Sequence, residues 1–186
     1  MCDSESPRTD GKRAALKSKY LFITALCLLA VSLLSLDIWT KYAVYSSFKE
    51  SLFSFEEYPV FRHFFGIDLS ITYTANTGAA WGMLSSWQNT LLIIRMIAVI
   101  GLLAYILFYN HIIGRTLPLM LIAIGAIGNI LDYFIYGHVV DMFLFTFWGH
   151  PFAVFNVADA AISIGVLLLC LNALKTNQTH AKHTPS

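Results

Sequence analysis

Charged residues are scarce in this sequence. Asp, Glu, Lys and Arg make up 12% of its 186 residues, whereas a typical soluble domain has about 25%. Hydrophobic residues make up 57%, and the mean hydropathy is +0.64. This composition excludes an ordinary soluble domain and indicates a membrane protein. The formal net charge of +1 gives no indication of a nucleic-acid partner, and we expect none.

Cysteine is also scarce, and its three positions are scattered. Cys27 and Cys170 lie in apolar runs, where a small buried thiol acts as a hydrophobic side chain, and Cys2 lies in a polar segment. No disulfide framework or zinc-binding spacing is present. No cluster of His, Cys and Glu suits a metal ion either. We therefore expect neither a metal nor another cofactor.

Long apolar runs, by contrast, dominate the sequence. Each is close to the length of about 20 residues that a helix needs to cross the hydrocarbon core of a bilayer. The first run is not a cleaved secretory signal, because no small-residue cleavage site precedes the polar residues that follow it. We therefore predict four transmembrane helices, at Leu21–Trp39, Thr90–Tyr109, Leu117–Tyr136 and Phe152–Leu174.

Basic residues are unevenly distributed between the segments that flank these runs. They gather in the amino-terminal segment, in the link between the second and third runs and in the carboxyl-terminal segment, whereas the loop between the third and fourth runs has none. Lys and Arg are enriched on the cytoplasmic side of membrane proteins. We therefore expect both termini in the cytoplasm, with residues 1–19 as a flexible polar tail and residues 176–186 as a second tail. The two larger loops then face outward.

The largest loop carries signals of its own, at about residues 43–89. Residues 67–74 alternate between apolar and polar side chains, which predicts a half-buried strand, and a turn follows at Ala75–Gly78. Ala79–Trp87 is apolar with two tryptophans, which is typical of a helix at the membrane interface. The predicted fold is an all-α polytopic membrane protein, with a domain at residues 20–175. It has four transmembrane helices, a small extracytoplasmic β-element and a short interfacial helix.

Five short polar groups interrupt the apolar pattern, and the predicted topology places all of them at the outer end of the bundle. Each group alone has a structural explanation, such as a hydrogen bond or a charge that reaches the headgroups. A charge at the bilayer centre costs about 2.5–3.5 kcal/mol, so five groups on one side indicate a functional site. The groups are Asp37 with Lys41, Asn76 with Gly78, Asn129 with Asp132, Asp141 alone, and Asn156 with Asp159.

The spacing of these residues predicts which of them act together. Asp37 and Lys41 are one helical turn apart and can form an ion pair. The pattern Asn-x-x-Asp occurs twice, at residues 129–132 and 156–159, and each pair is expected to share a helix face. Arg95 lies just inside the second run, where it either reaches the headgroups or has a functional role; the sequence leaves both open.

Asp141 and Asp159 are the candidates for catalysis. They lie on opposite sides of a turn between apolar segments, and each has polar neighbours. Two carboxylates close together cannot easily both ionise, so they hold one proton between them and titrate jointly. Such a pair can act as the acid and base that activate a water molecule.

Five blocks of sequence contain these residues: DIWTK at 37–41, NTGAAWG at 76–82, GNILD at 128–132, GHVVD at 137–141 and FNVAD at 155–159. In their order and spacing they resemble the bacterial lipoprotein signal peptidases, the type II signal peptidases. Any single block is weak evidence, whereas five in register are highly specific. The resemblance covers residues 20–175.

The resemblance implies an aspartic endopeptidase of the bacterial cytoplasmic (inner) membrane. Enzymes of this family hydrolyse the peptide bond just before the lipid-modified cysteine of diacylglyceryl-modified prolipoproteins, which are therefore the implied partners together with membrane lipid. The implied catalytic pair is Asp141 and Asp159, near the outer leaflet, and we expect a monomer. The implied supporting or substrate-binding residues are Asp37, Lys41, Asn76, Gly78, Asn129, Asp132, Asn156 and Ala158.

The sequence departs from the family pattern at two positions. Tyr133 stands where the family usually has an arginine after the aspartate of the third span, so we expect Asp132 to lack its usual ion-pair partner. Trp81 stands where phenylalanine is common.

Three other classes are weaker interpretations of the same residues. A small transporter or proton relay has polar residues through the whole membrane depth, whereas residues 102–107 and 164–171 are almost purely apolar. A structural scaffold leaves the repeated Asn-x-x-Asp spacing unexplained. A presenilin-type protease usually carries Gly-x-Gly-Asp, which is absent from this sequence.

Overall fold

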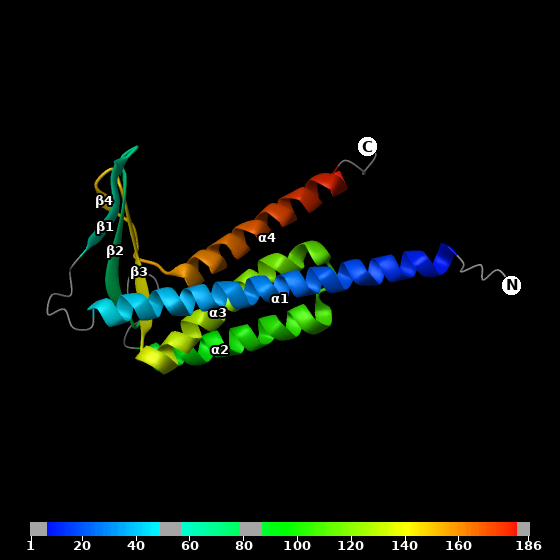
Figure 1. Ribbon diagram of the computed structural model, residues 1–186, viewed down its shortest axis with the longest axis horizontal. Coiled ribbons are helices and arrows are strands. Elements are labelled where there is room, and N and C mark those ends of the chain that lie inside the picture. The colour runs from blue at the N-terminus through cyan, green and yellow to red at the C-terminus, as the bar shows by residue number, and fades with distance from the viewer. Residues whose placement is uncertain (1–6, 49–56, 79–86, 182–186) are drawn as a thin grey trace.

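The computed structural model describes residues 7–48, 57–78 and 87–181 (Figure 1). Four helices in this part of the chain are long and apolar enough to cross a membrane: Tyr20–Phe48, Gln88–Tyr109, Ile113–Tyr136 and Val157–Lys175. The four helices expected from the apolar runs are therefore confirmed, and the chain is a mostly helical membrane protein.

The first helix, α1 (Pro7–Phe48), is longer than predicted at both ends. Residues 7–19, which we expected in a flexible tail, are helical, and the helix continues past Trp39. No glycine or proline lies between Leu21 and Phe48, so nothing in the sequence ends the helix where the apolar run ends. The extension carries Lys41 into the interior of the molecule, where its side chain has no solvent exposure.

The other helices follow the predicted order with shifted ends. Helix α2 (Gln88–Ala104) finishes in one π-helical turn, η3 (Tyr105–Tyr109), and α3 (Ile113–Tyr136) runs back beside it. Helix α4 (Val157–Ala181) begins later than predicted. The prediction of helix from Phe152 was wrong because Phe155 instead makes backbone hydrogen bonds to Met142 and Phe143.

Helices α3 and α4 approach each other through glycines. A Cβ atom on Gly125 would lie 2.3 Å from the carbonyl oxygen of Ala158, and one on Gly165 would lie 2.7 Å from that of Pro118. Only glycine fits at such distances. Small residues of this kind let membrane helices pack backbone against backbone, and this packing fixes the start of α4 against the middle of α3.

A four-stranded antiparallel sheet accompanies the helices, in the order β1-β2-β3-β4. Strands β1 (Tyr58–Phe64) and β2 (Ile67–Asn76) come from the large loop, so the predicted strand is confirmed in β2. Strands β3 (Val139–Phe147) and β4 (His150–Pro151) come from the loop between α3 and α4, which we had not predicted to be a strand. Of the predicted interfacial helix, residues 79–86 lie outside the described residues.

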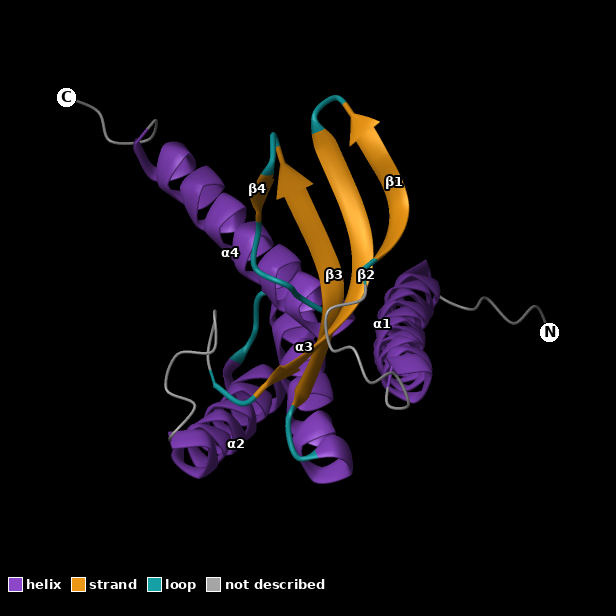
Figure 2. Ribbon diagram, turned by 90° about the vertical axis from the view of Figure 1, so that its left-hand side faces the viewer, coloured by secondary structure: helices purple, strands orange, loops and turns teal. Residues whose placement is uncertain are grey.

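The sheet lies across one end of the helix bundle, with its strands roughly perpendicular to the helices (Figures 1 and 2). Strand β3 links it to the bundle, because it starts three positions after α3 ends. At the bundle end of the sheet, Asp141 pairs with Thr74, and Val139 pairs with Asn76. This register brings the end of β2 and the start of β3 beside the ends of α1, α3 and α4.

Candidate active site

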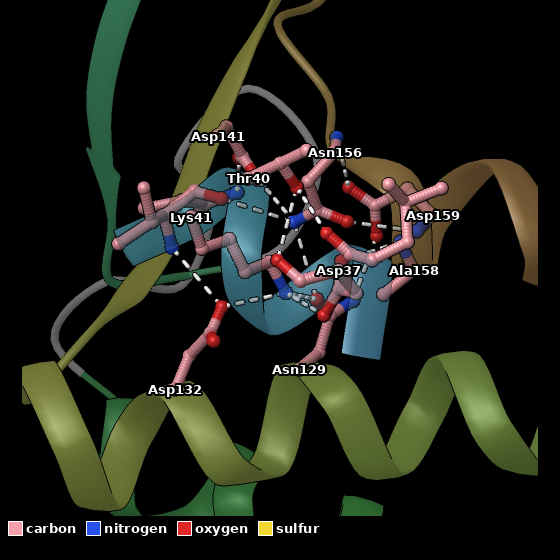
Figure 3. A network of polar contacts seen from close by, with 12 residues as sticks. Asp37, Thr40, Lys41, Asn129, Asp132, Asp141, Asn156, Ala158 and Asp159 are labelled. Carbon is pink, nitrogen blue, oxygen red and sulfur yellow. Dashed lines mark hydrogen bonds and ion pairs between the residues drawn. The ribbon is translucent and has the colours of Figure 1, made fainter. Parts of the chain in front are cut away.

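The residues predicted to form a site meet where the sheet joins the bundle. Helix α1 contributes Asp37 and Lys41, and α3 contributes Asn129 and Asp132. The strands and the start of α4 contribute the others, and Figure 3 shows most of them converging on one polar network. They are largely withdrawn from solvent: Lys41 and Asn156 have no exposed surface, and Asp37, Asp132 and Asp141 are each 2% exposed. No buried polar side-chain atom in the described residues lacks a hydrogen-bond partner.

Asp141 is held by two asparagine amides. The Asn156 Nδ2 atom donates to Oδ1 at 2.7 Å, and the Asn76 Nδ2 atom donates to Oδ2 at 2.9 Å. Neutral amides orient a carboxylate without neutralising it. The carboxylate therefore keeps its ability to exchange a proton.

Asp159 lies in the first turn of α4 and is held from the other side. The Asn129 Nδ2 atom donates to its Oδ1 at 2.7 Å. The remaining oxygen accepts the backbone N–H of Asn156 at 3.3 Å, while the Asn156 Oδ1 atom accepts the backbone N–H of Asp159 at 2.8 Å. This reciprocal pair has the form of a capping box, which satisfies two unpaired donors at a helix start.

The Asn-x-x-Asp spacing at 156–159 therefore has a different meaning from the one we expected. Asn156 does not share a helix face with Asp159, because it precedes α4 and caps it. Its side chain also donates to the Asn129 Oδ1 atom at 3.2 Å. Asn156 thus contacts the carboxylates of both Asp141 and Asp159 and bridges them.

Lys41 is the cation of this network. Its Nζ atom lies 2.7 Å from the Asp37 Oδ2 atom and 2.8 Å from the Asp132 Oδ2 atom, and it donates to the Asn129 Oδ1 atom at 3.1 Å. The predicted Asp37–Lys41 pair is confirmed. A buried lysine needs such partners, because removing one member of a buried ion pair costs about 3–5 kcal/mol.

Asp132 lacks the arginine that is its usual partner in the family, but it is not unpaired. Lys41 provides an ion-pair partner from α1, and Asp132 also accepts the backbone N–H of Val140, next to Asp141, at 3.2 Å. Tyr133 has a separate role, since its hydroxyl donates to the Asn89 Oδ1 atom at 2.5 Å and joins α3 to α2.

Asp37 connects α1 to the start of α4. Its Oδ1 atom accepts the backbone N–H of Ala158 at 2.8 Å, and a carboxylate at a helix start is favourable for the helix dipole. Gly128 makes this contact possible, since a Cβ atom there would lie 2.6 Å from the Asp37 Oδ2 atom and 3.3 Å from the Ala158 side chain. The sequence alone gave no reason for a glycine at position 128 of the GNILD block. The structure shows that a side chain there would collide with Asp37 and crowd Ala158.

The turn after β2 positions Asn76. The backbone N–H of Gly78 donates to the Asn76 Oδ1 atom at 3.0 Å, which leaves the amide nitrogen directed to Asp141. The Arg95 Nη2 atom, from α2, donates to the Gly78 carbonyl at 2.8 Å. Arg95 therefore reaches inward to this turn, and its contact with a polar loop is a role that only the tertiary structure reveals.

Burial and charge together raise the pKa of Asp141. Withdrawal from water disfavours the ionised form, the charge of Asp159 adds to the effect, and the two amides and Lys41 oppose it. The outcome raises the pKa of Asp141 from 3.8 to about 7. A carboxyl group with this pKa can lose or gain a proton near neutral pH, as acid–base catalysis requires.

No group of three or more metal-ligating side chains occurs in the described parts of the chain. The network has one cation, four aspartates and three asparagine amides, which suit proton transfer and hydrogen bonding to a peptide.

Comparison with known proteins identifies the family to which the chain is similar. Residues 29–175 match the family model described as Signal peptidase (SPase) II. A lipoprotein signal peptidase of Chlamydia pneumoniae is 38% identical over 160 residues, covering 83% of this chain and 95% of that protein. A lipoprotein signal peptidase of Staphylococcus aureus (strain JH9) is 34% identical over 160 residues, covering 84% and 92%.

Two solved structures have a similar fold, and both are described as bacterial membrane enzymes. One has a TM-score of 0.72 and 31% identity, covering 89% of this chain and 96% of its own. The other has a TM-score of 0.69 and 32% identity, covering 83% and 95%.

Proposed function

This chain belongs to the signal peptidase II family of aspartic peptidases, and from that premise we propose that Asp141 and Asp159 form its catalytic pair. The proposed reaction is hydrolysis of the peptide bond just before the lipid-modified cysteine of a prolipoprotein. The observation that carries the proposal is the bridge by Asn156, which hydrogen-bonds one carboxylate through its side chain and the other through its backbone N–H.

In the proposed mechanism, the pair holds one proton. The ionised carboxylate takes a proton from a water molecule as the water oxygen attacks the scissile carbonyl carbon, and the protonated carboxyl donates to the carbonyl oxygen. Collapse of the tetrahedral intermediate transfers a proton to the departing amide nitrogen and returns the pair to its starting state. The pKa of about 7 for Asp141 supports a shared proton at neutral pH.

The surrounding residues would act by positioning. Asn76, Asn129 and Asn156 each direct an amide N–H at a catalytic carboxylate. The ion pair between Lys41 and Asp132 holds α1 and α3 together next to the two catalytic carboxylates, and Asp37 pairs with the same lysine. Fixed donors of this kind stabilise charge without having to reorganise during the reaction, which is the main advantage of a preorganised site.

The proposed substrate is a diacylglyceryl-modified prolipoprotein that enters from the bilayer. The site lies at the end of the bundle that carries the sheet (Figure 2), and at this depth a scissile peptide can reach the carboxylates while its acyl chains stay in lipid. The proposed location is the bacterial inner membrane, with the site near the outer leaflet. The supporting evidence is the excess of basic residues in the two terminal segments and in the link between α2 and α3. Lys and Arg are enriched on the cytoplasmic side of a membrane, so the site, at the other end of the bundle, faces outward.

The test of the catalytic pair is substitution of each aspartate by its isosteric amide. Asp141→Asn and Asp159→Asn are each expected to lower cleavage by at least about 10²–10⁴-fold, because neither amide can exchange a proton. Cleavage of a purified diacylglyceryl-modified prolipoprotein is read from the shift of the product on a gel. Asp68→Asn, in β2 and away from the network, is the matched control and is expected to retain activity.

Two observations make the outcome decisive. Each variant is first shown to be membrane-inserted and monodisperse in detergent, so that loss of activity is not loss of fold. Near-normal cleavage by either Asp141→Asn or Asp159→Asn would then refute the proposed pair.

A further inference from the structure

Two tight turns lie side by side at the free end of the sheet. Phe65 and Gly66 connect β1 to β2, and Trp148 and Gly149 connect β3 to β4. All four residues have positive φ angles, of 52°, 79°, 47° and 82° in that order. Two-residue turns with both φ angles positive have the type I′ geometry that suits the twist of antiparallel strands.

The first residue of each turn is unusual for this geometry. Type I′ turns prefer Asn, Asp or Gly at both central positions, and a bulky side chain at positive φ is a strained outlier. Here the first positions are Phe65 and Trp148. Strain of this kind persists where the side chain has a function, so the aromatic rings need an explanation other than turn formation.

These rings form an exposed patch, the aromatic tip, made of Phe64, Phe65 and Trp148. Their exposed fractions are 62%, 83% and 75%. The backbone N–H of Trp148 donates to the Gly66 carbonyl at 2.7 Å, which holds the two turns together. The Phe64 and Phe65 rings pack edge to face, with centroids 5.0 Å apart. Exposed aromatic groups held this firmly are typical of a contact surface.

The position of the tip indicates what it contacts. The strands run across the helix axes (Figure 1), and the view along the bundle shows the turns projecting sideways past α1, α2 and α3 (Figure 2). In a protein whose helices cross a membrane, a sheet in this orientation runs parallel to the bilayer. The surface beneath the projecting turns is then lipid.

We propose that the aromatic tip docks on the bilayer surface at the level of the lipid headgroups. Tryptophan is enriched at this level because its ring is apolar and its N–H can hydrogen-bond. Arg62, exposed next to the tip on β1, is suited to the phosphate groups. The contact would hold the sheet, and Asp141 on β3, at a fixed height above the hydrocarbon.

The test uses the fluorescence of Trp148 in proteoliposomes. The protein has four tryptophans, so substituting Trp39, Trp81 and Trp87 by phenylalanine leaves Trp148 as the sole emitter. The expected result is at least about twofold quenching by phospholipids brominated near the headgroup end of the acyl chain, with little quenching by aqueous iodide. A matched variant that retains Trp39 alone, on the exposed surface of α1, serves as the depth reference.

Substitution of Phe65 separates lipid contact from turn formation. Phe65→Asn places a residue that the turn prefers, so the sheet is expected to be kept while quenching of Trp148 by brominated lipid falls. Val60→Asn, on exposed β1 away from the turn, is the control and is expected to leave quenching unchanged. If the triple substitution disturbs folding, the difference in quenching between the unmodified protein and Trp148→Phe measures the same contact.

Two results would overturn the proposal. Trp148 could be quenched by iodide and not by brominated lipid, which would place the tip in water. It could also be shielded from both quenchers while a cross-linker joins two tips, which would make a second copy of the chain the partner.

Discussion

At Asp141, both carboxylate oxygens accept a hydrogen bond from an asparagine amide rather than from a cation. The cation of the network, Lys41, is instead paired with Asp37 and Asp132. This division of roles has a physical reason. A cation in direct contact would hold Asp141 ionised well below neutral pH, whereas amides fix its orientation and leave its proton exchangeable.

The raised pKa of Asp141 predicts the pH dependence of cleavage. An aspartate with a pKa of about 7 keeps its proton to a higher pH than an ordinary aspartate does. If the pair needs one proton, that proton is lost as the pH rises, so kcat/KM is expected to fall above about pH 7. Measurement of kcat/KM between pH 5 and 9 checks this. A rate that climbs steadily to pH 9 contradicts a shared proton.

Asn76 offers a second check on the same carboxyl. Asn76→Asp replaces a hydrogen-bond donor by a negative charge, which disfavours ionisation of Asp141. The alkaline limb of the pH profile is therefore expected to move up by about one unit. An unchanged alkaline limb would mean that a group other than Asp141 determines it.

Arg95 connects two secondary-structure elements, because its hydrogen bond to the Gly78 carbonyl joins α2 to the turn that follows β2. Arg95→Ala frees the Gly78 carbonyl and loosens the support of Asn76, so kcat is expected to fall about 10-fold through misplacement of the amide. The alkaline limb is expected to move up as well, since Asp141 loses part of its hydrogen bonding. Arg95→Lys keeps a donor and is expected to recover part of the rate.

The control for Arg95 is Arg115→Ala, which removes a cation at the start of α3, in the link between α2 and α3. It is expected to leave both kcat and the pH profile unchanged. Equal effects of the two substitutions would assign the loss to insertion or stability rather than to Asn76.

Gly128 controls the spacing between α1 and α3. In Gly128→Ala the new Cβ atom would lie 2.6 Å from the Asp37 carboxylate, and relief of such overpacking typically costs about 1–3 kcal/mol. Gly101→Ala has nothing within 4 Å of its new atom and is expected to be neutral or slightly stabilising. Thermal denaturation of the two variants in detergent compares them directly. Equal midpoints would show that α1 and α3 tolerate the extra atom.

For the whole molecule, the distribution of basic residues predicts the orientation in the membrane. A cysteine at Asp68 in the sheet is expected to react with a membrane-impermeant maleimide added to spheroplasts, whereas one at Arg115 is expected to react only after lysis. Both are made in a chain that lacks Cys2, Cys27 and Cys170. The reverse pattern of labelling would invert the topology and place the sheet in the cytoplasm.

The helices show how far sequence reasoning reaches in this protein. Four apolar runs of spanning length became four helices because a bilayer accepts few other backbone conformations. Their ends were less predictable. The true end of α1 depends on the absence of a helix breaker after Trp39, and the start of α4 depends on the pairing of Phe155 with β3.

The sheet shows where that reasoning ends. β2 was predictable from its alternation of apolar and polar side chains, although the face that it buries most deeply is the polar one, with Ser70 and Thr72. β3 was not, because Val139 to Met142 are buried without alternation and such a run does not distinguish a strand from a helix. Its pairing with β2 joins residues more than sixty positions apart, such as Asn76 and Val139. Such a pairing depends on the tertiary fold and not on the local sequence.

The four helices, the polar residues grouped at one end and the family all follow from the residues alone, because hydrophobic length and short motifs are local properties of a chain. The folded arrangement was needed to show that Lys41 is the partner of Asp132, that Asn156 bridges two aspartates and that Arg95 supports Asn76. Each of these contacts joins elements far apart in the chain. Their geometry follows from how α1, α3, α4 and the sheet pack, and no local pattern specifies it.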